Sequence, residues 1–154
     1  MLKPILSAAV FAALATPAFA NGPDTYVVNF RNNDAAESAR LDRAIDEALR
    51  IAGVNAEEVV IDTSTAAKWE KGAHEAFDRG IVPVFNKWVG LPGFAAIVDA
   101  RTKQIVSCVN SHHSASEIAS EVRTKTQMAQ GRAVKSDAAF GKTTQCPPAH
   151  NAGH

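Results

Sequence analysis

The sequence has no excess charge of either sign and lacks several of the common functional motifs. Lys and Arg together number 16, Asp and Glu also number 16, and the formal net charge is zero. A chain without a net field has no general attraction for nucleic acid or for anionic lipid. It contains no glycine-rich phosphate loop, no Ser-His-Asp signature and no basic patch with interleaved aromatic residues. These absences argue against nucleic-acid binding, phosphate-loop chemistry and serine hydrolysis.

Long apolar runs are also absent, except at the N-terminus. There residues 5–15 follow Lys3 and precede the small-residue pattern Ala18-Phe19-Ala20. This is the pattern of a secretory signal peptide, and the apolar run is shorter than the roughly 20 residues that a spanning helix needs. We therefore interpret residues 1–20 as a signal peptide cleaved near Ala20, with an uncleaved anchor as the alternative. The remaining chain is expected to be periplasmic or secreted and to have no membrane span.

Cysteine is scarce, with only Cys108 and Cys146 in the chain. In an oxidising compartment two cysteines most often pair. We expect a disulfide bond that closes a loop of about 38 residues and contributes roughly 3–4 kcal/mol in the chain-entropy model. A single reactive thiol at Cys108, which would make the protein a thiol-disulfide enzyme, is the alternative.

Apolar periodicity divides the rest of the chain into short strands and amphipathic helices. The predicted strands are residues 26–30, 59–61, 94–98 and 104–109. Of the predicted helices, the first follows Asp34, the second follows Thr63 or Ser64, the third has Pro83 in its first turn, and the last follows Ser114. An apolar face is expected on the second helix from Trp69, Ala73, Ala76 and Phe77. The order β-α-β-α-α-β-β-α begins with a crossover and ends with a hairpin, so it predicts an α/β sandwich with a four-stranded mixed sheet.

Helix ends are marked by capping residues. Asp34 with Glu37 and Ser114 with Glu117 fit capping boxes, and Gly53 fits a C-terminal stop. After about residue 128 the periodicity fails. Residues 21–128 are therefore predicted to form one domain, and residues 129–154 a poorly ordered tail tied down at Cys146.

This order of elements, with Leu91-Pro92 before the third strand, resembles the thioredoxin fold over about residues 24–124. In that family the proline at this place is cis, and its loop faces the active site. Redox members carry Cys-x-x-Cys just after the first strand, where a helix N-terminus lowers the thiol pKa. Here residues 30–35 read FRNNDA and contain no nucleophile. The resemblance therefore implies the fold without the redox chemistry.

A second likeness covers residues 74–106, "HEAFDRGIVPVFNKWVGLPGFAAIVDARTKQIV". This stretch is expected to form a helix, a Gly-Leu-Pro turn, a strand ending in Asp99 and a hairpin. It is similar to exported proteins of integrating conjugative elements and to the TrbC and TraW group of conjugative transfer proteins. The chain departs from this likeness in Gly93 and in its His-containing tail. The likeness implies a non-catalytic periplasmic accessory of a conjugative or type IV secretion apparatus.

The partner surface expected from the fold is the groove between the first helix's N-terminus and the proline loop. Unpaired backbone at such a place can bind an extended peptide of a periplasmic protein. The candidate partner-binding residues are Leu91, Pro92, Asn32 and Asn33.

The histidines support a different hypothesis, an exported protein that binds copper or zinc. Imidazole and thiolate are ligands that these metals prefer, and a tail folded back toward Cys108 would bring several together. The candidate ligands are His112, His113, Cys146, His150 and His154. The simpler interpretation is that the histidines are solvated, the cysteines are oxidised and no cofactor binds.

Overall fold

The computed structural model describes residues 22–134 and 145–150, which form an α/β fold. The predicted signal peptide and much of the predicted tail lie outside the described residues. The order of strands and helices is the one predicted from periodicity. The elements are β1 (Thr25–Arg31), α1 (Ala36–Ala52), β2 (Ala56–Asp62), α2 (Ala66–Asp78), α3 (Val82–Trp88), β3 (Phe94–Asp99), β4 (Ile105–Asn110) and α4 (Ala115–Ala129).

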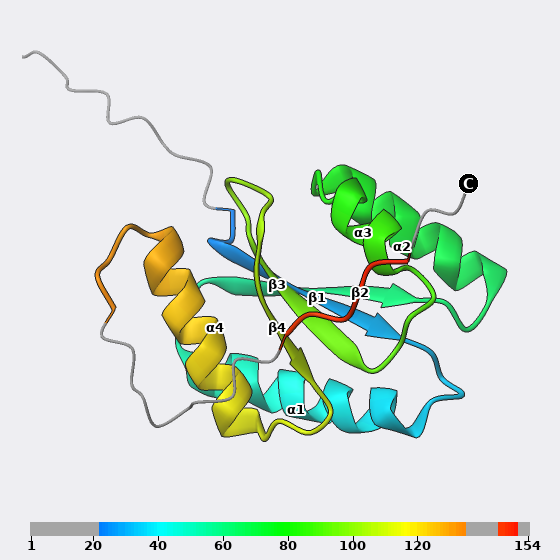
Figure 1. Ribbon diagram of the computed structural model, residues 1–154, viewed down its shortest axis with the longest axis horizontal. Coiled ribbons are helices and arrows are strands. Elements are labelled where there is room, and N and C mark those ends of the chain that lie inside the picture. Colours follow the sequence, from blue (N-terminus) through cyan, green and yellow to red (C-terminus); the bar gives the residue numbers. More distant parts are fainter. Residues whose placement is uncertain (1–21, 135–144, 151–154) are drawn as a thin grey trace, which may run out of the picture.

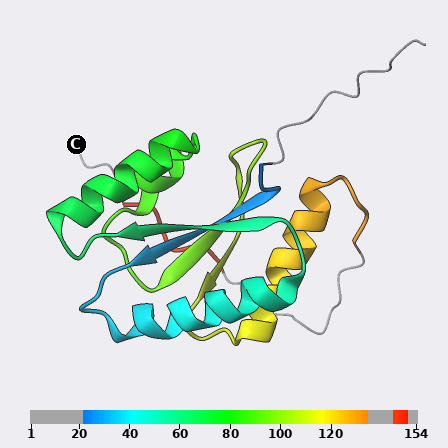
Figure 2. The same ribbon diagram turned by 180° about the vertical axis from the view of Figure 1, so that it is seen from behind.

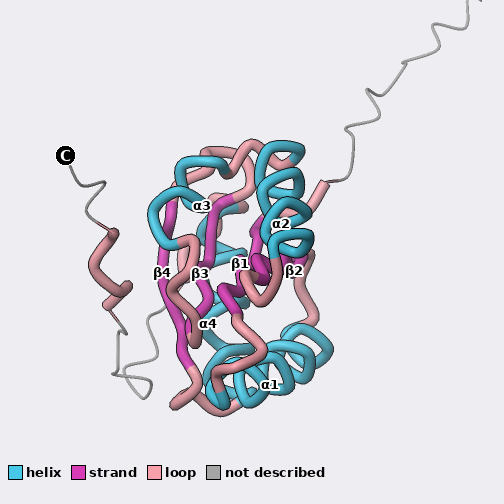
Figure 3. Tube along the Cα trace, turned by 90° about the vertical axis from the view of Figure 1, so that its right-hand side faces the viewer, coloured by secondary structure: helices cyan, strands magenta, loops and turns pink. Residues whose placement is uncertain are grey.

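The four strands form one mixed sheet in the order β2-β1-β3-β4. Strands β1 and β2 are parallel, whereas β3 is antiparallel to both β1 and β4. Figure 3 shows the four strands side by side in this order. The parallel pair follows from the crossover through α1, and the antiparallel pair β3–β4 follows from its short connection.

Two helix layers cover the sheet, with α1 and α4 on one face and α2 and α3 on the other (Figure 1). Figure 2 shows the same layers from behind. Side chains alternate along β1, so that Val28 and Phe30 face the α2/α3 side while Val27 faces the α1/α4 side. Because both faces are covered, β1 and β3 are buried along nearly their whole length.

A buried hydroxyl pair joins the two ends of the described domain. Thr25 at the start of β1 and Thr126 in the last turns of α4 have oxygens 2.7 Å apart, and both residues are fully buried. This bond spans 101 residues of sequence and holds α4 on its face of the sheet. None of the helices in the described ranges combines the length and hydropathy needed to cross a bilayer.

Some helix ends are as predicted and one is not. Ser114 and Glu117 form the expected capping box, and Gly53 ends α1 in the left-handed conformation. The prediction for α1 was wrong, because Ala35 is its N-cap and makes no side-chain cap bond. The Asp34 amide instead donates to Asn32 Oδ1, so this stretch forms an Asx turn before the helix.

Candidate binding groove

An open groove of about 310 Å³ lies where the predicted partner surface was placed. It is lined by Glu37 at the start of α1, residues 91–94, residues 110–112 and Pro147. Four segments distant in sequence therefore build it. Leu91, Pro92 and Phe94 provide apolar surface, whereas Glu37 and His112 provide polar groups. The groove therefore combines apolar surface with a few polar groups along its rim.

The proline loop is fixed by backbone bonds to the core. The amide of Leu91 donates to the Trp88 carbonyl at 2.9 Å, and the amide of Gly93 donates to the Phe30 carbonyl at 3.0 Å. Gly93 has a φ of 91°, and a Cβ there would lie 3.4 Å from the Glu37 Cβ. Glycine therefore permits both the turn and the close approach of the loop to α1.

The peptide bond before Pro92 is trans, since the described residues contain no cis peptide bond. The cis proline implied by the thioredoxin resemblance is therefore not found. The chain reverses instead through two glycines with positive φ, Gly90 at 89° and Gly93 at 91°. These two residues allow the loop to turn with a trans bond between them.

The loop between β4 and α4 forms the opposite wall. The His112 amide donates to Asn110 Oδ1 at 3.0 Å, and the Asn110 amide donates to His113 Nδ1 at 3.1 Å. His113 is thus used to hold the loop. His112 is exposed and lines the groove.

A C-terminal strap, defined here as residues 145–150, lies outside the edge strand β4 and is bonded to β4 and to the end of α3, beside this groove (Figure 3). The predicted disulfide is confirmed: Cys146 in the strap is bonded to Cys108 in β4, with 5.0 Å between their Cα atoms. Neither cysteine is a free thiol. The single-thiol alternative at Cys108 thus has no thiol to use while this bond is intact.

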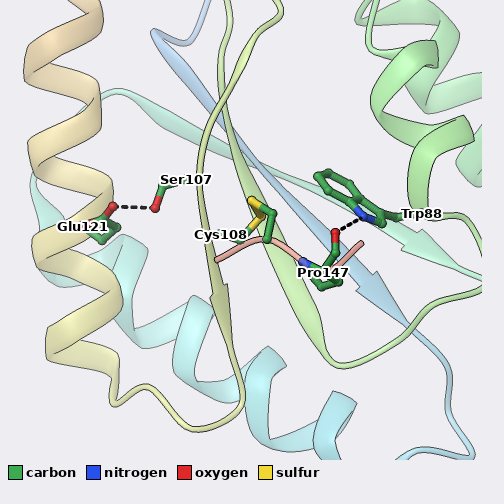
Figure 4. The surroundings of a disulfide bond; sticks show 6 residues. Trp88, Ser107, Cys108, Glu121 and Pro147 are labelled. Carbon is green, nitrogen blue, oxygen red and sulfur yellow. Dashed lines mark hydrogen bonds between the residues drawn. A yellow bond between two sulfur atoms is a disulfide. The ribbon is translucent and has the colours of Figure 1, made fainter. Parts of the chain in front are cut away.

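Two further hydrogen bonds hold the strap, and Figure 4 shows the one between Trp88 and Pro147. The Trp88 indole Nε1 donates to the Pro147 carbonyl at 3.0 Å. The His150 amide donates to the Lys87 carbonyl at 3.0 Å. Trp88 itself is fully buried and contacts Phe94 edge-on, with 5.3 Å between ring centroids. A rigid aromatic residue therefore presents its one polar atom to the strap.

Asn32 and Asn33, which were predicted to contact a partner, do not line the groove. They organise the turn between β1 and α1. Asn32 Oδ1 accepts from the Asp34 amide, and the Asn33 amide donates to Ser64 Oγ. Among the groove residues, Leu91 and Pro92 were predicted from the sequence to bind a partner, whereas Glu37 and Pro147 were not assigned to this surface.

The candidate metal ligands are not assembled in the described part of the chain. No group of three or more His, Cys, Asp or Glu side chains there is placed to hold a metal ion. Cys146 is bonded to Cys108, and His113 holds its own loop. His150 is exposed in the strap, and His154 lies outside the described residues.

A polar cluster lies elsewhere, between β1, β2 and α1. Asn29 is 1% exposed, and its Nδ2 donates to Asp42 Oδ1 and to Glu58 Oε1, both at 2.9 Å. Burial raises the pKa of Glu58, an effect that the Asn29 hydrogen bond partly offsets. At Asp62 burial acts in the same upward direction but is outweighed, because hydrogen bonds from Ser64 and Lys68 lower the pKa.

No family model matches the chain, and no curated protein or solved structure matches it. The fold and the groove define an α/β protein with an open surface groove and a disulfide-held C-terminal segment beside it.

Proposed function

We propose that this protein is an exported, non-catalytic binding module. It captures an extended segment of a partner protein in the groove between α1 and the Leu91-Pro92 loop. It acts as an accessory in the assembly of a conjugative or type IV secretion apparatus.

The observation that carries this proposal is the strap itself. Residues 145–150 form neither helix nor strand, and they use the Pro147 carbonyl and the His150 amide to bond with α3 residues. Pro147 also forms part of the groove wall. The end of α3 beside the groove therefore already accepts a proline-containing segment, through hydrogen bonds to a carbonyl and an amide of its backbone. A partner segment with the same chemistry fits the same kind of surface.

Other features support the details. The strand order β2-β1-β3-β4, with β1 and β2 parallel, supports a thioredoxin-like arrangement. Export is supported by the pattern in residues 1–20 and by the disulfide, which persists in oxidising compartments. A non-catalytic role is supported by the turn after β1, which offers no nucleophile, and by the pairing of both cysteines. The conjugative assignment is supported by the likeness of residues 74–106.

The test is site-specific photo-crosslinking in the producing cell. A photoreactive amino acid at His112 lies in the groove, whereas one at Met128 lies on exposed α4 surface away from it. We expect a discrete adduct from position 112 and none from position 128. Adducts of equal yield from both positions would contradict a specific groove.

A proline pair provides the matched variants. Pro92→Ala alters the groove, whereas Pro83→Ala changes a proline in the first turn of α3, outside the groove lining. We expect Pro92→Ala to lower the adduct yield from position 112 while Pro83→Ala leaves it unchanged. Both variants should retain the circular dichroism spectrum of the original protein.

A further inference from the structure

We infer that the C-terminal strap is a redox-releasable cover of the surface around Trp88 that adjoins the binding groove. In the oxidised protein the Cys108–Cys146 bond holds the strap in place, where it limits how far a partner segment can extend beyond the groove. Reduction by a dithiol frees the strap and opens the surface around Trp88. This inference rests on the proposed function, because a partner segment in the groove would extend into the place that the strap leaves.

Apart from the disulfide, little holds the strap. Gln145, Pro148, Ala149 and His150 are exposed, and only Cys146 and Pro147 are partly buried. Its other attachments among the described residues are the Trp88–Pro147 and Lys87–His150 hydrogen bonds and the packing of Cys146 against the core. The disulfide is therefore the main restraint on its position.

Without the disulfide, the docked and released positions of the strap are closely balanced. Cys146 lies roughly 17 residues beyond the end of α4 at Ala129, and closing a loop of that length disfavours the docked strap about 200-fold in the chain-entropy model. Two net hydrogen bonds favour docking by about fivefold each, or about 30-fold together, and the packing of Cys146 against the core adds to this. Breaking the disulfide therefore removes the restraint that decides where the strap lies.

The two sulfur atoms differ in accessibility. Cys108 is 2% exposed, whereas Cys146 is partly exposed. A thiolate of the dithiol therefore attacks Cys146 Sγ, the bond to Cys108 breaks, and Cys108 leaves as a thiolate that takes up a proton. The second thiol then displaces Cys146, so that the dithiol becomes a cyclic disulfide and supplies two electrons. Both protein cysteines end as thiols.

Release changes the groove at defined atoms. The indole Nε1 of Trp88 loses its acceptor and the carbonyl of Lys87 loses its donor. Pro147 also leaves the groove wall, which extends the open surface from Pro92 toward Cys108. A partner segment fits if it offers a carbonyl to the indole and, three residues further on, an amide to the carbonyl.

The two tryptophans make release measurable in the intact chain. Trp88 is buried and bonded to Pro147, whereas Trp69 on α2 is 46% exposed and packs against Phe85. Two indole N–H signals are expected in a ¹⁵N-labelled sample, and Trp88→Phe assigns them. On adding dithiothreitol, we expect the Trp88 signal to shift and its hydrogen exchange to accelerate about fivefold or more. The Trp69 signal serves as the internal reference and should not change.

A variant without the bond gives an independent measurement. Cys146→Ser changes the partly exposed cysteine and leaves the buried Cys108 in the core. It should reproduce the reduced Trp88 signal without reductant. Thiol counting first confirms that the protein is fully reduced. If the Trp88 signal is then unchanged, the inference is overturned. An unchanged Trp88 signal in Cys146→Ser would overturn it as well.

The covering role is tested with the photoreactive residue at position 112. If the strap competes with the partner, Cys146→Ser raises the adduct yield several-fold over the oxidised protein. An equal yield despite release of Trp88 overturns the covering role and leaves the proposed function standing. No adduct in either form overturns the proposed function, and with it the covering role.

Discussion

The buried hydroxyl pair between Thr25 and Thr126 allows the packing of α4 on β1 to be tested by a double-mutant cycle. Both residues are fully buried and their oxygens are 2.7 Å apart. Thr126→Val keeps the side-chain shape and removes one hydroxyl. It leaves the Thr25 hydroxyl buried without this partner, which we expect to lower the free energy of unfolding by about 1–3 kcal/mol. Thr25→Val should have a similar cost for the same reason.

The double variant should behave differently from the sum of the two single variants. With both hydroxyls gone, no polar group of this pair is buried without a partner, so we expect a free energy of unfolding within about 0.5–1 kcal/mol of the original protein. The coupling between the two sites should therefore be at least about 1 kcal/mol.

Urea unfolding followed by circular dichroism and tryptophan fluorescence measures each corner of the cycle. The dependence of the free energy on urea should stay constant, since the surface exposed on unfolding is unchanged. If the double variant loses the sum of the two single losses, the hydroxyls are not partners and the account of how α4 is attached to β1 is wrong.

Three further predictions concern single residues. Since burial raises the pKa of Glu58 above its usual 4.5, ionisation of Glu58 costs stability as pH rises through that raised value. Glu58→Gln should therefore unfold at a higher urea concentration than the original protein at pH 7. This gain in stability should vanish below the usual pKa of Glu58, where both side chains are neutral. A gain in stability that persists at pH 3 would argue against the burial effect. Gly93→Ala should lower the free energy of unfolding by about 1–2 kcal/mol, because Gly93 has a positive φ and a Cβ there would lie close to the Glu37 Cβ. Urea unfolding measures this loss, and its absence would mean that the loop adopts another turn. Ser114→Ala should cost about 1 kcal/mol by removing the capping box of α4, measured in the same way. Ser120→Ala, beyond the first turn of the same helix, is the control.

The order of elements was predictable because its signals are local. β3 is buried on both faces, so it is a continuous apolar run in the sequence. The capping box at Ser114 and the left-handed Gly53 depend only on neighbouring residues. The start of α1 depends on more distant groups, because Ser64 accepts from the Asn33 amide across 31 residues. Periodicity carries no information about such a contact.

The apolar face of α2 was only partly predictable for a similar reason. Ala76 is buried as expected, but Phe77 is 74% exposed and Trp69 is 46% exposed. Gly72 lets the helix backbone approach β2 closely, because a Cβ added at this residue would lie 3.5 Å from Ile61. The buried face is therefore narrow and centred on Gly72 and Ala76, which leaves the larger side chains beside it.

Some residues of the groove were predictable from local sequence, and others only from the placement of distant segments. Leu91 and Pro92 were predictable because a proline before an apolar strand marks a loop in this order of elements. Glu37 and Pro147 became part of the groove only when α1 and the strap were placed in space. The metal site stays a prediction. Two of its candidate ligands have other partners, because Cys146 is bonded to Cys108 and His113 accepts from the Asn110 amide in the β4–α4 loop.

The outer edge of β2 has a consequence for how the protein behaves in concentrated solution. An unpaired edge strand can join the edge of another sheet and start aggregation. Here Glu58, Asp62, Lys68, Lys71 and Arg79 border a surface hollow along this strand. A second strand docking there would have to strip water from these charges, which disfavours sheet-to-sheet association. Acid would protonate the carboxylates but leave Lys68, Lys71 and Arg79 charged, so this barrier should persist at low pH.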